Sequence, residues 1–312
     1  MGESAHENLR DGARGLIAYT SSNPFEFTQI VTGEGGDGQT VFGHLLFPDV
    51  YDGPVPCIVA CHGSFNWRGH HYDHIARFLD MGFAVFRVHT FDARGAQDIS
   101  ANQMDVTAAM MMADAYGALR LVATHPDIDE TRIGLAGWSL GGCVALYAAW
   151  TPIAEALAPE GERFAAHLPV YPAAHIRCED NRWTGAPVRI LIGAAEDYTP
   201  ASHALALSTD LQKQGFPAET IAYRDAYHSF DSLEYVTFMP DAIALEEAVT
   251  VTIRVDGSMV ITGTDADVST PEGRLIGFAD LARRGAHVGG HRQARRRAFA
   301  DAESFLRAHL TD

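Results

Sequence analysis

Short apolar runs alternate with segments of helical periodicity along more than half of this chain. Runs typical of buried strands are VPCIVACHG, FAVFRVHTF, RIGLAG, FAAHLPVY, VRILIGAA and ETIAYRDA. Between them lie segments with apolar residues at helical spacing: HYDHIARFLDMG, MDVTAAMMMADAYGALRLVATH, CVALYAAW and ASHALALSTDLQKQG. Strands that alternate with helices in this way build parallel sheets covered on both faces. From Pro56 to about Ala226 the pattern therefore predicts an α/β fold with a mostly parallel central sheet.

No linker or repeat divides this region, so we expect an irregular N-terminal arm at residues 1–24 and a single α/β domain at 25–312. After His228, roughly 60 residues precede the last helical segment, GHRQARRRAFADAESFLRAHL, which is long for one connection. Within them, TVTIRV and SMVITG flank Asp256-Gly257, a pair typical of a tight β-hairpin. The sequence predicts an insertion at about 232–285 that is either a flap over the site or a contact between subunits.

A glycine-rich stretch near the N-terminus resembles a nucleotide-binding motif. Gly33, Gly35 and Gly38 in GEGGDG satisfy GxGxxG. A dinucleotide site requires a helix directly after the glycines, whereas a strand-like run, QTVFGHLLF, follows them here. We therefore predict that the loop joins this run to a strand formed by FEFTQIVT, as a hairpin turn, and we expect no organic cofactor.

Charge and cysteine content restrict the partners. The formal net charge of −17 disfavours binding to nucleic acid or to an anionic membrane surface. No apolar run reaches the length of a membrane span, and the first residues, MGESAHENLRDGARG, lack the apolar region of a secretory signal, so we expect a cytoplasmic protein. The histidines His70, His71 and His74 lack a carboxylate or cysteine at ligand spacing, and we expect no metal. Free, buried thiols are expected at Cys57, Cys61, Cys143 and Cys178.

One serine lies between two glycines in Gly137-Trp138-Ser139-Leu140-Gly141, which fits GxSxG. An apolar strand-like run precedes it and an apolar helical run follows. A tight strand–serine–helix turn crowds the neighbouring backbone, so small residues are needed on either side of the serine. Such a turn holds the serine hydroxyl exposed above the sheet. The pattern predicts Ser139 as a nucleophile.

A serine nucleophile needs an imidazole to take its proton and a carboxylate to orient that imidazole. In this architecture both follow the serine in the chain, in the order acid then histidine, each after a later strand. VRILIGAAEDYTP places Glu196 and Asp197 after one strand, and ETIAYRDAYHSF places His228 after the next. We predict a triad of Ser139, Asp197 and His228, with Glu196 as the alternative acid.

The remaining parts of the site follow from their neighbourhood. The backbone N–H of Leu140, together with that of Ser64 or Phe65 in the loop CHGSFNWRGHH, is predicted to form an oxyanion hole. Aromatic and basic side chains beside these positions are candidates for the substrate pocket, against the alternative of core packing or turn stabilisation. These candidates are Trp67, Arg68, Arg94, Trp138, Tyr198 and Phe230.

Several of these motifs together resemble the dienelactone hydrolase family of α/β-hydrolases. They are HGSFNWRG, FDARG, HPDIDETRIGLAGWSLGG, GAAEDYTP and AYHSFD, and they span roughly residues 55–231. The resemblance implies an α/β-hydrolase fold, Ser139, Asp197 and His228 at the triad positions, and hydrolysis of a small-molecule ester or lactone through an acyl-enzyme without a cofactor.

The chain departs from the family in its nucleophile and its length. Dienelactone hydrolases proper carry a cysteine nucleophile where this chain has Ser139, which favours a serine esterase of the broader family. The segment from about Ser232 to Gly285 exceeds what a minimal member needs. A peptidase or amidase on the same fold, or a non-catalytic ligand-binding homologue, is the alternative interpretation. The sequence leaves open whether the chain forms a homo-oligomer.

Overall fold

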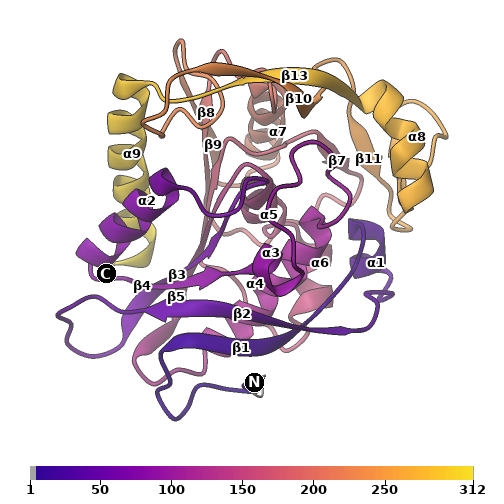
Figure 1. The fold of residues 1–312 in the computed structure, drawn as a ribbon. Helices are drawn as coiled ribbons and strands as arrows, with labels where there is room; N and C mark the ends of the chain where they lie inside the picture. Colours follow the sequence, from indigo (N-terminus) through magenta and orange to yellow (C-terminus); the bar gives the residue numbers. More distant parts are fainter. Residues whose placement is uncertain (1–4, 312) are drawn as a thin grey trace.

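A computed structural model describes residues 5–311 and places a twisted eight-stranded sheet at the centre of the molecule (Figure 1). The strands follow one another across the sheet in the order β1 (Gly15–Ser22), β2 (Gly38–Leu46), β4 (Ala84–Val88), β3 (Val55–Cys61), β5 (Ile128–Trp138), β6 (Ala166–Val170), β8 (Val188–Gly193) and β9 (Ala218–Tyr223). Neighbours from β4 to β9 are parallel, whereas β1 and β2 add antiparallel pairs at one edge. The prediction of a mostly parallel α/β sheet is confirmed.

Helices cover both faces of this sheet. Their bounds are α1 (Phe27–Val31), α2 (Gly69–Asp80), α3 (Thr90–Ala93), α4 (Ala108–Val122), α5 (Leu140–Tyr147), α6 (Thr151–Leu157), α7 (Ala201–Lys213), α8 (Pro271–Leu281) and α9 (Arg292–Leu310). In Figure 1, α2 and α9 lie side by side on one side of the sheet, and α4, α5 and α6 lie on the other. Every residue of β3 is consequently buried, which explains why its sequence is one continuous apolar run.

The structure corrects the interpretation of the N-terminal region. Residues 1–4 lie outside the described chain, but Gly15–Ser22 form β1 and not an irregular arm. The FEFTQIVT segment, expected as a strand, contains helix α1, because Glu26 and Gln29 form a capping box in which the Glu26 N–H donates to Gln29 Oε1 at 2.6 Å. Strand β2 therefore pairs with β1 across the glycine-rich loop.

The insertion builds a separate layer over the carboxyl ends of the sheet strands. The predicted hairpin at Asp256-Gly257 is confirmed, since β11 (Val251–Ile253) pairs antiparallel with β12 (Met259–Ile261), and β11 also pairs with the short strand β7 (Ile176–Cys178). A second, two-stranded ribbon joins β10 (Thr237–Leu245) to β13 (Ala282–Val288). Figure 1 shows this ribbon crossing from the end of α9 to α8.

None of the helices in the described part of the chain is long and apolar enough to cross a lipid bilayer.

Candidate active site

Ser139 occupies a strained turn between β5 and α5. Its backbone has φ 55° and ψ −112°, a region that residues other than glycine rarely adopt. A Cβ at Gly137 would lie 2.0 Å from the carbonyl oxygen of Gly141, and a Cβ at Gly141 would lie 2.2 Å from that of Cys61. Both glycines are therefore required by close backbone approach. The GxSxG pattern forms the sharp turn that the sequence predicts.

His228 joins this serine to a carboxylate. Its Nε2 lies 2.9 Å from Ser139 Oγ, and its Nδ1 lies 3.0 Å from Glu196 Oε2. Since an ionised carboxylate only accepts hydrogen bonds, Nδ1 carries the proton and Nε2 is free to accept from the serine hydroxyl. The side chains of His228 and Glu196 are almost fully buried, at 1% and 0% exposure. The three side chains form one continuous hydrogen-bonded chain.

The carboxylate that contacts His228 Nδ1 belongs to Glu196, so the predicted choice of Asp197 as the acid is wrong on the geometry. Glu196 Oε1 accepts backbone N–H bonds from Tyr198 at 2.9 Å and Thr199 at 3.2 Å, which fixes the carboxylate facing His228. Asp197 instead contacts β13, where its two carboxylate oxygens lie 2.8 Å from the backbone N and 2.7 Å from Nδ1 of His287. The two neighbouring acids leave the turn in different directions.

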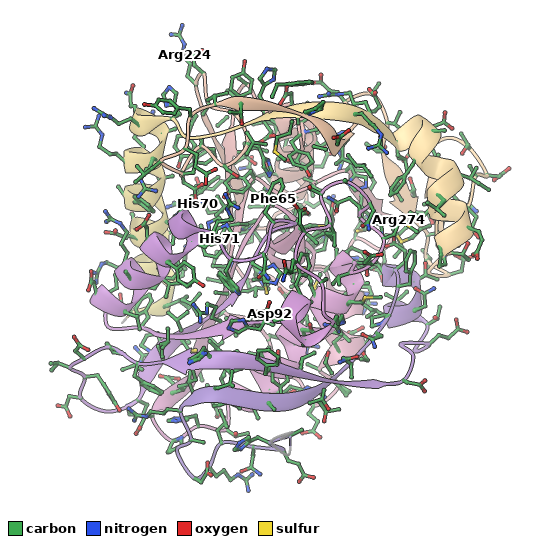
Figure 2. The ribbon with its side chains drawn as sticks, in the orientation of Figure 1. Phe65, His70, His71, Asp92, Arg224 and Arg274 are labelled. Carbon is green, nitrogen blue, oxygen red and sulfur yellow. The ribbon has the colours of Figure 1, made fainter. Side chains whose placement is uncertain are left out.

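The loop after β3 contacts Ser139 directly. A Cβ at Gly63 would lie 3.1 Å from Ser139 Cβ, so this loop and the serine turn are in van der Waals contact. Within residues 5–311, the backbone N–H groups of Leu140, Ser64 and Phe65 have no hydrogen-bond acceptor. Ser64 and Leu140 line the cavity beside Ser139, whereas the Phe65 ring packs in the middle of the molecule beneath the β10–β13 ribbon (Figure 2).

A buried carboxylate, Asp231, supports the histidine loop. It accepts hydrogen bonds from Tyr171 Oη at 3.0 Å and from His74 Nε2 at 3.0 Å, and it is wholly inaccessible to solvent. Burial raises the pKa of this carboxyl, but His70 and His74 outweigh that effect and hold its pKa below the usual range. The Asp231 side chain thus stays ionised and anchors the segment that carries His228.

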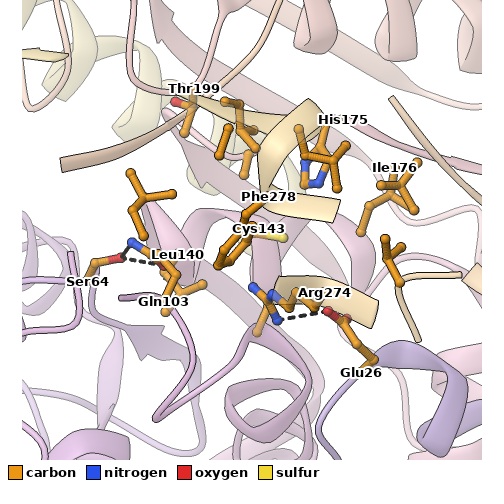
Figure 3. A pocket seen from close by; sticks show the side chains of 18 of the residues that line it. Glu26, Ser64, Gln103, Leu140, Cys143, His175, Ile176, Thr199, Arg274 and Phe278 are labelled. Carbon is orange, nitrogen blue, oxygen red and sulfur yellow. Dashed lines mark hydrogen bonds and ion pairs between the residues drawn. The ribbon is translucent and has the colours of Figure 1, made fainter. Parts of the chain in front are cut away.

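A cavity of about 120 Å³ opens beside Ser139. Most of its walls are apolar, and the insertion provides much of the cover through Ile243, Leu245, Val251, Met259, Val268, Phe278 and Leu281. An ion pair between Glu26 and Arg274, with 2.8 Å between Oε1 and Nη1, lies in the wall opposite the Ser64–Gln103 contact (Figure 3). Two roles were expected for the insertion, a flap over the site and a contact between subunits. The structure shows the first, because insertion residues cover the cavity beside Ser139.

One of the predicted pocket side chains, Tyr198, lines this cavity. The other aromatic candidates pack elsewhere. The Trp67 indole N–H donates to the Val88 carbonyl oxygen, Trp138 is fully buried, and Phe230 packs against the ring of Tyr223.

The two arginine candidates are also held away from the cavity. Arg94 makes a bidentate ion pair with Asp114, with distances of 2.7 and 3.0 Å, and so stabilises the core beneath α4. Arg68 pairs with Glu234 at 2.8 Å on the surface. Neither arginine lines the cavity, and the carboxylate partner of each holds its guanidinium elsewhere.

Sequence reasoning missed Glu26, Arg274, His175 and Asp231 as neighbours of the site. Glu26 and Arg274 give little signal because their ion pair joins positions 248 residues apart, whereas Asp231 lies in the AYHSFD motif shortly after His228 and offered a signal that was not used. His175 lines the cavity, and burial lowers its pKa to about 3, so its ring is neutral. No group of histidine, cysteine, aspartate or glutamate side chains suited to hold a metal occurs in the described residues.

A serine at a strained turn after the central strand of a mostly parallel sheet, with acid and histidine following after later strands, defines an α/β-hydrolase. The model of the dienelactone hydrolase family matches residues 43–253, which is more than half of the chain. The chain therefore belongs to the dienelactone hydrolase family and is a carboxylic ester hydrolase.

Similar proteins include one from Yersinia pestis, provisionally described as a carboxymethylenebutenolidase. The two are 26% identical over an alignment of 211 positions that covers 62% of this chain and 76% of that protein. A crystal structure from Klebsiella pneumoniae, provisionally described as a dienelactone hydrolase, is 20% identical with a TM-score of 0.48, covering 69% of this chain and 88% of that one. Esterase Est2 of Thermogutta terrifontis with bound propionate is 19% identical with a TM-score of 0.49, covering 61% and 80%.

Proposed function

We propose that this protein hydrolyses small carboxylic esters or lactones through an acyl-enzyme, with Ser139 as nucleophile, His228 as general base and acid, and Glu196 as the orienting carboxylate. The observation that carries the proposal is the hydrogen-bonded chain from Ser139 Oγ through both ring nitrogens of His228 to Glu196 Oε2. The same chain is the arrangement that lets an imidazole accept the serine proton.

The reaction follows from this geometry in two halves. In the first, Oγ attacks the ester carbonyl carbon while its proton moves to His228 Nε2, and the imidazolium that forms is stabilised by the Glu196 carboxylate. Collapse of the tetrahedral intermediate breaks the bond to the alcohol oxygen, which takes the proton from Nε2. In the second half a water molecule attacks the acyl group in the same manner and releases the acid and free Ser139.

The backbone N–H of Leu140 and that of Ser64 or Phe65 receive the negative charge on the carbonyl oxygen. They lie in the turn after the nucleophile and in the loop that touches it, and they have no other acceptor in the described chain. Donors that are unpaired before the reaction need no rearrangement when charge develops.

The cavity favours substrates with a small apolar part. Its walls are mainly aliphatic, and its volume of about 120 Å³ suits a short acyl or alkyl group. The provisional description of the Yersinia pestis relative names a butenolide, which is an unsaturated lactone, so lactones should be tested beside open esters.

The test uses a fluorophosphonate probe and a panel of small aryl esters, lactones and the matching anilides. We expect the wild-type protein to be labelled and to turn over esters or lactones, and Ser139→Ala to lose both properties. Ser258→Ala, which changes a serine of the hairpin turn that bonds to Asp256 and does not line the cavity, is the control and should keep both. Undiminished labelling of Ser139→Ala would exclude Ser139 as the nucleophile, and preference for the anilides would identify an amidase.

A further inference from the structure

Two tyrosine rings enclose the imidazole of His228. The ring centroids of Tyr171 and Tyr198 each lie 4.6 Å from that of His228, with interplanar angles of 56° and 50°. Both tyrosines are buried, at 1% and 3% exposure. They hold the ring in a similar way, so the difference between them lies in their hydroxyl groups.

The hydroxyl of Tyr171 has a hydrogen-bond partner of normal geometry, whereas that of Tyr198 has the Gln103 side chain nearby but forms no such bond. Tyr171 Oη donates to Asp231 Oδ1 at 3.0 Å. Tyr198 Oη is inaccessible to solvent and makes no hydrogen bond of normal geometry with any described residue. A buried hydroxyl without a partner destabilises the folded protein, so its presence calls for a role that the unliganded structure does not satisfy.

The surroundings of the Tyr198 hydroxyl point toward the oxyanion side of the site. Tyr198, Gln103, Ser64, Leu140 and Ser139 all line the same cavity. Gln103 lies beside the Tyr198 hydroxyl, and its amide is engaged by Ser64, with 3.2 Å between Nε2 and Oγ. Ser64 belongs to the loop that contacts Ser139. Tyr198 therefore lines the cavity, and its hydroxyl lies beside Gln103, which contacts the loop of the predicted oxyanion hole.

The hydroxyl is also in the correct protonation state to donate. Burial raises the pKa of Tyr198, with a further contribution from Asp98, so the phenol keeps its proton at every pH at which the imidazole can act as a base.

We propose that Tyr198 is a catalytic residue whose Oη–H donates a hydrogen bond to the carbonyl oxygen of the bound ester, beside the backbone amides of the oxyanion hole. The bond strengthens as negative charge develops on that oxygen in the tetrahedral intermediate. No proton is transferred in this step, because Oη keeps its hydrogen throughout. The inference rests on the proposed function, since it requires acyl transfer to Ser139.

Tyr198→Phe tests the proposal because it keeps the ring against His228 and removes only the hydroxyl. We expect kcat for a small aryl ester to fall about 100-fold, the effect typical of losing one oxyanion donor, while KM changes little. The inhibition constant of a trifluoromethyl ketone, which forms a hemiketal oxyanion on the serine, should rise by a similar factor. The melting temperature should stay equal or rise, because an unpartnered buried group is lost.

Tyr171→Phe is the matched control for stability. It also keeps a ring beside His228, but it removes a donor from the buried Asp231 carboxylate, so its melting temperature should fall. A fall of similar size in Tyr198→Phe would show that the Tyr198 hydroxyl has a structural role and would overturn the proposal.

Kinetic outcomes decide the rest. Unchanged kcat and unchanged ketone inhibition in Tyr198→Phe would refute the proposal. A raised KM at constant kcat would also refute it, because the hydroxyl would then bind a part of the substrate remote from the reacting carbonyl group. These results differ from a failure of the proposed function, which would appear as absent fluorophosphonate labelling in the wild-type protein itself.

Discussion

Replacing the carboxylate of the proposed triad tests the assignment most directly, because the two adjacent acids Glu196 and Asp197 offer a matched pair of variants. In Glu196→Gln the amide keeps the shape of the carboxylate and loses its charge. Its carbonyl oxygen is needed by the backbone N–H groups of Tyr198 and Thr199, which donate to Oε1 in the native protein. The NH₂ group must then face His228 Nδ1, 3.0 Å from the present position of Oε2.

This arrangement forces the wrong tautomer of the imidazole. With a donor facing it, Nδ1 must accept, so the proton moves to Nε2, which then cannot take the proton of Ser139. In other Ser-His-acid triads the equivalent change lowers kcat by about 10⁴, which corresponds to roughly 5 kcal/mol of barrier. The Glu196 side chain is fully buried, so no water molecule can take the place of the carboxylate beside His228. We therefore expect a loss of kcat of the same order here.

Asp197→Asn is the control. Its carboxylate contacts His287, whose side chain is 40% exposed, and does not contact His228. We expect kcat/KM within roughly threefold of the wild type and a stability change below about 1 kcal/mol. The assay is steady-state hydrolysis of an aryl ester, with thermal unfolding to show that both variants fold. A large loss in Asp197→Asn together with a mild one in Glu196→Gln would refute the assignment of the acid.

Two further predictions concern buried ionisable side chains. Burial lowers the pKa of His62 and His167 to about 4. Between pH 6.5 and 4 the unfolded chain therefore binds protons at these histidines that the native state does not bind. The stability that the two neutral rings contribute is complete above pH 6.5 and is lost as the pH falls toward 4. Between pH 6.5 and 5 each of the two histidines accounts for a loss of about 1.6 kcal/mol of unfolding free energy, so urea unfolding of His167→Gln should show a pH-dependent loss smaller by about that amount; a loss equal to that of the wild type would contradict the reasoning. Arg94→Met leaves the fully buried Asp114 carboxylate unpaired and should cost about 3–5 kcal/mol of unfolding free energy, partly restored by adding Asp114→Asn, without changing ester preference. If Arg94→Met kept the full unfolding free energy but changed the ester preference, Arg94 would have to contact the substrate.

The central sheet is predictable from the sequence because parallel strands covered on both faces are apolar throughout, as β3 shows. Strands with little burial give no such signal. Strand β10 is exposed along most of its first half, and its partner β13 carries Arg283 and Arg284, so neither matches the alternation of a half-buried strand. Helix α1 escapes prediction because its capping box outweighs a β-like composition over only five residues.

Some residues of the site are likewise predictable from the sequence and others are not. Ser139 and His228 follow from the positions of strand ends, which the sequence reveals. The choice between Glu196 and Asp197 depends on the direction in which each side chain leaves one turn, and that direction is fixed by the N–H groups of residues 198 and 199 and by His287. The arginine candidates fail for a related reason, because the ion pair that engages Arg68 is formed with Glu234, 166 positions away.

Part of the cover over Ser139 lies outside the stretch that the family model matches. Ser139, Glu196 and His228 lie within the stretch shared with the family, whereas Met259, Val268, Phe278 and Leu281 of this cover lie beyond residue 253, where the family match ends. Part of the cavity wall can therefore be varied without changing the stretch that carries the proposed triad. Exchanging residues 254–281 offers a route to altered ester preference in which the reacting groups keep their positions.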